Sequence, residues 1–135
     1  IISRGGNYLL NIAPGPTGDY DQAAYDRLNE LAAWMKINQT AVFATRTIAP
    51  YHQGDYYYTR SKDSKVVNVF HLSEGDTYQQ PNEYVFQVPD NFSVKKIAIL
   101  GHKGKLDWSQ RGNQITLRSP STRFSYATAI QLQSK

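Results

Sequence analysis

Seven short stretches between residues 55 and 132 alternate apolar and polar side chains, and they constrain the fold more than any other feature of the chain. Alternation with a period of two is the pattern of a β-strand with one face buried and the other in water. Turn-forming residues separate the stretches at intervals of roughly eight to twelve residues. This spacing predicts an antiparallel β-sandwich, with strands at 55–60, 65–72, 82–88, 94–100, 105–109, 114–118 and 127–132.

The same alternation predicts which side chains fill the interior of the sandwich. The stretch 65–72 carries apolar residues on both faces, which is typical of a central strand. In the run Tyr56-Tyr57-Tyr58, the middle ring must face opposite to its neighbours, so one side of the run is expected to be exposed. We expect a single shared core that contains Phe86, Ile97, Ile99, Trp108, Leu117 and Ile130.

The N-terminal part of the chain has a different pattern. The apolar run Tyr8 to Ile12 is short and bounded by glycines and prolines, which predicts a buried strand. The prolines and glycines of 14–18 predict a turn after it. A helix signal follows at once over 19–38, so the unit is a strand, a loop and a helix, or half of a βα repeat.

The predicted helix has one apolar stripe, because Ala24, Leu28, Leu31 and Met35 recur at spacings of four, three and four. Its N-cap is either Asp19, with Gln22 three residues on, or Asp21. Such a stripe needs a partner surface. After the helix, residues 39–54 contain Pro50 and Gly54 and are expected to connect the helix to the sandwich.

Residues 5–14 read Gly-Gly-Asn-Tyr-Leu-Leu-Asn-Ile-Ala-Pro, and a Gly/Asp turn and a helix ending Trp34-Met35-Lys36-Ile37-Asn38 follow. This order resembles the α-L-fucosidases of glycoside hydrolase family twenty-nine. The run 38–46 resembles the helix exit of that family, which is usually written Asn-Gly-Glu-Ala-Ile-Tyr-Gly-Thr-Arg. Gln39, Thr40 and Ala44 depart from this pattern. The resemblance is dense over 3–46, and over 55–132 it depends on strand order rather than on motifs.

The resemblance implies that residues 1–46 are the last strand and last helix of a catalytic (β/α) barrel. Residues 47–54 would then be a connector and 55–135 a C-terminal β-sandwich domain. The parent enzyme would be a retaining α-L-fucosidase that hydrolyses terminal α-linked L-fucose from glycans, in a secreted, periplasmic or lysosomal location. The family's nucleophile and acid/base lie before this segment, so the chain itself is expected to be structural and inactive alone.

Among the residues present, Asn11 is the candidate for a substrate-pocket or positioning role. It falls near the C-terminal end of the predicted barrel strand, which is the end where barrel enzymes place their sites. Its amide can orient a catalytic group or a sugar hydroxyl. Alternatively, it satisfies buried backbone groups beside the Pro14 turn.

The sequence gives little support for a catalytic carboxylate pair, a metal site or a nucleic-acid-binding surface. A retaining glycosidase needs two carboxyl groups about 5 Å apart, whereas the aspartates and glutamates here fall almost entirely in helix-cap, helix-face or turn positions. His52, His71 and His102 lack metal-ligand spacing, and cysteine is absent, so we expect neither a metal nor a cofactor. The net charge of +4 comes from scattered lysines and arginines, so we expect no nucleic-acid or membrane partner.

A second function remains open, namely a non-catalytic carbohydrate-binding β-sandwich module. Trp108 and the run Tyr56–Tyr58 would then stack on sugar rings, whereas alternation with Leu106 favours a core position for Trp108. The strand at 8–12 favours the fucosidase, because a free-standing module has no need of a buried barrel strand. The chain begins Ile1-Ile2, and we expect this start to lie inside a larger protein. Residues 1–46 would then need a barrel-supplying chain, or would self-associate.

Overall fold

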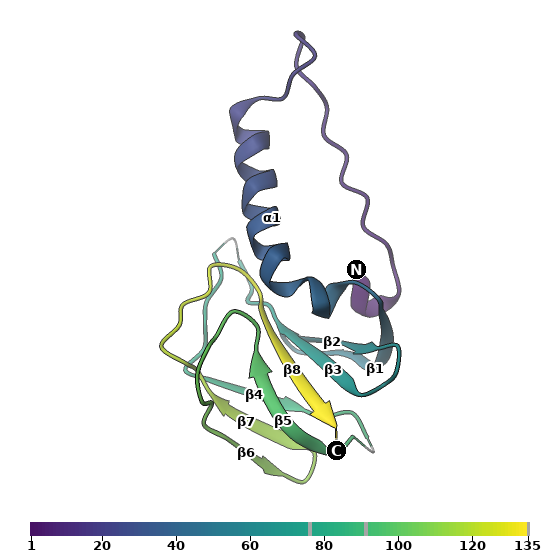
Figure 1. The fold of residues 1–135 in the computed structure, drawn as a ribbon, viewed down its shortest axis with the longest axis vertical. Helices are drawn as coiled ribbons and strands as arrows, with labels where there is room; N and C mark the ends of the chain where they lie inside the picture. The colour runs from purple at the N-terminus through teal and green to yellow at the C-terminus, as the bar shows by residue number, and fades with distance from the viewer. Residues whose placement is uncertain (76, 91, 135) are drawn as a thin grey trace.

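The computed structural model describes residues 1–75, 77–90 and 92–134. It contains a two-layer antiparallel β-sandwich and a long helix that stands on one of the two sheets (Figure 1). The five-stranded sheet has the order β1-β2-β3-β8-β5, and the three-stranded sheet has the order β4-β7-β6. The strands are β1 Thr45–Gln53, β2 Tyr56–Ser61, β3 Val66–His71, β4 Glu83–Gln87, β5 Val94–Ile99, β6 Trp108–Arg111, β7 Gln114–Arg118 and β8 Thr128–Ser134.

The seven predicted strands are confirmed as β2 to β8, mostly to within one or two residues at each end. The prediction for β6 began too early, since pairing with β7 starts at Trp108. The prediction for the connector missed β1, which pairs with β2 along the edge of the larger sheet. Pro50 lies in β1 where the register shifts between Thr47 and His52, and an edge strand tolerates the missing N–H of a proline.

The core lies between the two sheets and is made by alternate side chains of both. Of the six predicted core residues, Phe86, Ile97, Ile99, Leu117 and Ile130 are buried. Trp108 is only half-buried and packs against the border of this core. The prediction of a shared core is therefore confirmed for five residues. The sixth, Trp108, is only partly buried at the border of the core.

The helix α1 spans Gln22–Val42, so it starts three residues later and ends four residues later than the predicted range 19–38. Asp21, rather than Asp19, is the N-cap, and its carboxylate accepts a hydrogen bond from the Ala24 N–H at 2.7 Å. The helix ends where Ala44 adopts the left-handed conformation, with φ of 56°. An L-residue rarely adopts this conformation inside a helix, so the chain leaves the helical path there.

Only the C-terminal part of α1 is held against the sandwich, on the outer face of the five-stranded sheet (Figure 1). Thr59 donates from Oγ1 to the Ala41 carbonyl at 3.2 Å, and Asn68 donates to Thr59 Oγ1 at 3.1 Å. Gln131 donates to Asn68 Oδ1 at 2.9 Å. Burial of polar groups without partners is costly, and this row of bonds satisfies the polar outer face that the helix covers.

The predicted strand at 8–12 is not present in the described part of the chain. After the short 3₁₀ helix η1, Ile2–Arg4, residues 6–14 form an arm that leads away from the sandwich to a turn beyond the start of α1 (Figure 1). Leu9 is 91% exposed, and Tyr8 and Leu10 are also exposed. A strand needs a neighbouring backbone to pair with, and no other segment described here runs beside the arm. The predicted turn is confirmed by the hydrogen bonds Gly15 N–H to Asp19 O and Gly18 N–H to Gly15 O.

Candidate functional site

Asn11 lies in the arm, and its side chain is exposed. Among the described residues, no side chain or backbone group forms a hydrogen bond with its amide. Asn11 is the one site residue that the sequence predicts, and in the described part of the chain it stands without a hydrogen-bonding partner.

The carboxylates of the described residues are all exposed. Six of them accept hydrogen bonds. The donors lie within six residues along the chain for Asp19, Asp21, Asp26, Glu30 and Asp63, whereas Asp90 accepts from the side-chain amide of Asn113. Asp76 lies outside the described residues. The hydrogen bond from the Tyr25 hydroxyl holds the pKa of Asp19 below its ordinary value, and the Ser61 hydroxyl does the same for the pKa of Asp63. The general acid of a glycosidase needs a raised pKa, so these two shifts go the opposite way.

The three histidines lie in different parts of the sandwich. His52 stacks on Tyr57 with ring centroids 5.7 Å apart, and His102 shares a hydrogen bond of 2.8 Å between Nδ1 and Thr122 Oγ1. His71 is buried on the inner face of β3. Within residues 1–75, 77–90 and 92–134, no three side chains of the metal-binding kinds come together.

His71 belongs to a small polar cluster inside the sandwich. Its Nδ1 is 2.9 Å from the Tyr78 hydroxyl, which is 2.7 Å from Thr128 Oγ1, and the Tyr84 hydroxyl is 3.2 Å from the same Thr128 atom. Burial lowers the pKa of His71 and raises the pKa of Tyr78. The cluster therefore favours a neutral imidazole that is held by hydroxyl groups, and this arrangement stabilises the fold without exposing a reactive atom.

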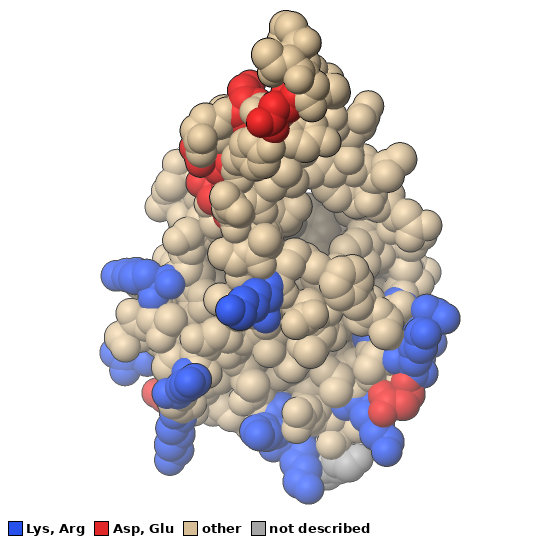
Figure 2. Space-filling view, turned by 45° about the horizontal axis from the view of Figure 1, so that its top comes forward, with Lys and Arg blue, Asp and Glu red and all other residues tan. Residues whose placement is uncertain are grey.

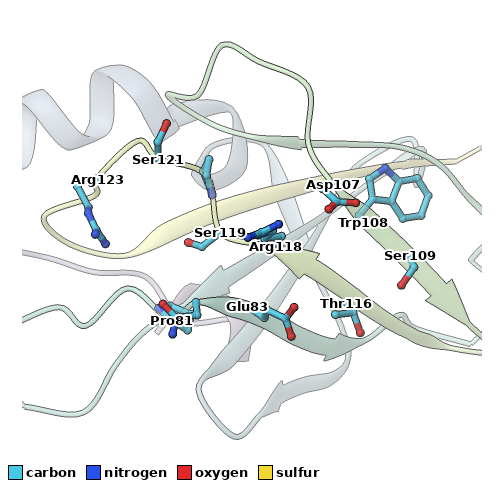
Figure 3. A pocket seen from close by; sticks show the side chains of 12 residues that line it. Pro81, Glu83, Asp107, Trp108, Ser109, Thr116, Arg118, Ser119, Ser121 and Arg123 are labelled. Carbon is cyan, nitrogen blue, oxygen red and sulfur yellow. The ribbon is translucent and has the colours of Figure 1, made fainter.

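A hollow of about 920 Å³ opens over the three-stranded sheet and the loop that follows β7 (Figure 3). Glu83 of β4, Arg118 of β7 and Trp108 of β6 line it, together with Asp107 and Arg123 from neighbouring loops. Sheet order brings the three strand residues together, because β7 lies between β4 and β6. No motif in the sequence indicates this hollow. The only signal is the alternation that places Glu83 and Arg118 on the same outward face.

Charge is distributed unevenly over the surface. The acidic residues of the turn before α1 and of its first turns gather at the far end of the helix, and lysines and arginines surround the sandwich in this view (Figure 2). The basic residues are spread among strands and turns rather than along one element. In the described part of the chain, no helix is both long and apolar enough to span a membrane.

Comparison with known proteins points to one family. The Alpha-L-fucosidase family model matches residues 1–40. Tissue alpha-L-fucosidase of Rattus norvegicus is 35% identical over 113 residues, which are 81% of this chain and 23% of that protein. Plasma alpha-L-fucosidase of Homo sapiens is 25% identical over 140 residues, covering 96% of this chain and 29% of that protein. The chain therefore spans about a quarter of the length of the curated relatives it matches.

Two solved structures share the fold over almost the whole chain. A GH29 alpha-L-fucosidase from Bacteroides thetaiotaomicron matches with a TM-score of 0.80 and 21% identity, over 99% of this chain and 29% of that one. The Thermotoga maritima alpha-fucosidase in complex with fucose matches with a TM-score of 0.73 and 19% identity, over 97% of this chain and 31% of that one. At these identities, the likeness establishes the arrangement of helix and sheets.

Proposed function

Because this chain belongs to the α-L-fucosidase family, glycoside hydrolase family 29, we propose that it is the C-terminal structural part of a retaining α-L-fucosidase. The parent enzyme hydrolyses terminal α-linked L-fucose from glycans, outside the cytoplasm. The observation that carries this proposal is the match of residues 1–40 to the family model, which covers the arm and most of the helix. A sandwich that only binds sugars does not need such a segment.

The proposed division assigns residues 1–46 to the edge of a catalytic barrel, 47–54 to a connector and 55–135 to the supporting sandwich. Support comes from the exposed apolar side chains of the first part, since Leu9 is 91% exposed and Ile37 and Leu31 of α1 are 51% and 42% exposed. Several large apolar side chains exposed on one part of a chain usually mark a contact with another body. We assign that contact to the barrel, which pairs with the arm and covers the helix.

In this arrangement the arm forms the last barrel strand, and Asn11 lies at its C-terminal end. Barrel enzymes build their active sites at that end of the strands. Asn11 is therefore assigned a positioning role, in which its amide orients a neighbouring catalytic group or a hydroxyl of the fucose ring. Its exposed, unbonded side chain leaves both the donor and the acceptor of the amide available for this role.

The proposal is tested by grafting. The corresponding segment of the Bacteroides thetaiotaomicron α-L-fucosidase is replaced by this chain, and hydrolysis of an aryl α-L-fucoside is measured for the chimera and for the chain alone. The chimera is expected to hydrolyse the fucoside. The chain alone is expected to show no turnover, because losing the nucleophile and acid/base removes the covalent route.

Asn11→Ala in the chimera is expected to lower kcat/KM, whereas Asn29→Ala on the exposed face of α1 serves as a matched control that leaves it unchanged. Turnover by the purified chain alone would contradict the structural role. A folded chimera without activity would contradict the family-based assignment of the segment.

A further inference from the structure

Two tyrosines form a pair where the chain enters α1. The ring centroids of Tyr20 and Tyr25 are 5.8 Å apart and the ring planes meet at 70°, which is an edge-to-face arrangement. The two residues are 40% and 39% exposed. They lie beside the turn that ends the arm, at the end of the helix that points away from the sandwich (Figure 1). The pair is therefore open to solvent and far from the sandwich core.

One carboxylate holds this pair in place. Asp19 Oδ1 accepts a hydrogen bond from the Tyr25 hydroxyl and another, at 2.8 Å, from the Tyr20 N–H. The backbone carbonyl of Asp19 accepts from the Gly15 N–H at 2.7 Å, and a Cβ added at Gly15 would lie 3.3 Å from that carbonyl oxygen. The pair therefore stands on a closed, tightly built turn, which reduces the entropy lost when a ligand binds.

The fold leaves part of this cluster unused. Both bonds to the Asp19 side chain end at Oδ1, and among the described residues no hydrogen bond engages its Oδ2 or the Tyr20 hydroxyl. A tyrosine ring offers an apolar face with a polar edge, and a carboxylate oxygen accepts strong hydrogen bonds from hydroxyl groups. These two features are complementary to the C–H face and the hydroxyl groups of a pyranose ring.

The proposed arrangement puts this pair on the active-site face of the barrel. With the arm as the last barrel strand and α1 as the helix after it, residues 14–21 are a loop that leads from strand to helix. Such loops surround the active site at the C-terminal end of the barrel strands. Tyr20 belongs to this loop and Tyr25 to the first turn of α1. Both tyrosines therefore lie on the same face of the barrel as Asn11.

We propose that Tyr20 and Tyr25 form a surface of the parent enzyme that binds the sugar unit to which the fucose is attached. The ring of that sugar lies against the exposed tyrosine rings, and Asp19 accepts a hydrogen bond from one of its hydroxyl groups. The inference rests on the proposed function, because the barrel brings the fucose next to this pair. It adds residues that select the glycan rather than the fucose. Binding a remote part of the substrate in this way can raise kcat/KM for the substrates that carry it.

The test uses the chimera described above and two substrates. Fucosyllactose carries a sugar next to the fucose, whereas α-L-fucosyl fluoride carries none. Tyr20→Ala is expected to lower kcat/KM about tenfold for fucosyllactose and by less than about twofold for fucosyl fluoride. A tyrosine that only supports the start of the helix would lower both values equally. Tyr20→Phe keeps the ring and is expected to restore kcat/KM for fucosyllactose to within about twofold of the unchanged chimera.

Tyr51→Ala is the matched control, because Tyr51 is 48% exposed and lies on β1 of the sandwich, and it is expected to leave both values unchanged. The inference is overturned if Tyr20→Ala lowers kcat/KM equally for both substrates, if it lowers neither, or if Tyr51→Ala causes the same selective loss. A chimera that hydrolyses fucosyl fluoride but not fucosyllactose overturns the inference and leaves the proposed function standing. A chimera that hydrolyses neither substrate overturns the proposed function and this inference with it.

Discussion

At the scale of single residues, the backbone of Ala44 is strained, because this residue adopts a left-handed conformation directly after the helix. It follows α1 with φ of 56° and is exposed, at a place where the family pattern has glycine. The left-handed conformation costs an L-residue about 1–2 kcal/mol, and glycine avoids this cost.

Ala44→Gly is therefore expected to raise the free energy of unfolding by about 0.5–1 kcal/mol, after the greater freedom of glycine in the unfolded chain is subtracted. Urea denaturation measures the change. The matched control is Ala33→Gly, which makes the same substitution at an exposed position inside α1 and is expected to lower the free energy of unfolding by about 1 kcal/mol. A loss of stability in both variants would contradict the strain at Ala44.

His71 links stability to pH. It is 6% exposed and faces the Tyr78 hydroxyl and the rings of Tyr56 and Tyr84. Burial lowers its pKa below the ordinary value of 6.5, although the charge of Asp55 opposes this effect. As the pH falls, the unfolded chain takes up a proton at this position before the folded chain does.

The free energy of unfolding is therefore expected to fall as the pH is lowered from about 7 to about 5. His71→Gln is expected to remove most of this dependence, whereas His52→Gln, at an exposed position, is expected to keep it. Thermal unfolding at a series of pH values measures both. An equally steep pH dependence in the His71→Gln variant would show that another group is responsible.

At the scale of the elements, the strands owe their stability to one face. In β4, Phe86 is buried in the core, whereas its neighbour Val85 points outward and is 42% exposed. Their side chains lie on opposite faces of one strand, so the two positions share the backbone and differ in burial.

Phe86→Ala is expected to lower the free energy of unfolding by about 3–5 kcal/mol, the range for deletion of a large core aromatic side chain. Val85→Ala is expected to change it by less than about 1 kcal/mol, since surface substitutions have small effects. Chemical denaturation of the two variants measures the difference. Similar losses at both positions would mean that the outer face of β4 is covered in solution.

At the scale of the whole molecule, most of the exposed large apolar side chains of the described residues lie in the arm, in the turn after it and in the helix. Tyr8, Leu9 and Leu10 of the arm and Leu31 and Ile37 of α1 are exposed. Complete burial of one leucine is worth roughly 1.5–3 kcal/mol, so a body that covers this surface gains several such contributions.

In isolation, the chain is expected to self-associate through residues 1–46, or to co-purify with a polypeptide that supplies the barrel. Light scattering at increasing concentration measures the association. Leu9→Lys combined with Leu10→Lys is expected to reduce it, whereas Val85→Lys, a matched change on the sandwich, is expected to leave it unaltered. A clean monomer at high concentration would contradict the assignment of residues 1–46 as barrel segments.

The sequence by itself determined the sandwich strands, the presence of the helix and most of the core. These features follow from alternation and capping, which are properties of neighbouring residues, so Phe86, Leu117 and Ile130 are buried as predicted. The sequence missed β1 because an edge strand that contains a proline pairs on one side only and carries little alternation. It also placed a strand at 8–12, where an apolar run has no partner in the described chain.

Only the tertiary structure decided which side chains meet. The sheet order β4-β7-β6 brings Glu83, Trp108 and Arg118 around one hollow, although they are far apart along the chain. The end of α1 likewise depends on the polar bonds from Thr59 and Gln131 that hold its last turns on the sheet. Local patterns fix the faces of each strand because side chains alternate along the backbone. They do not fix which strands become neighbours, because pairing depends on the packing of the whole chain.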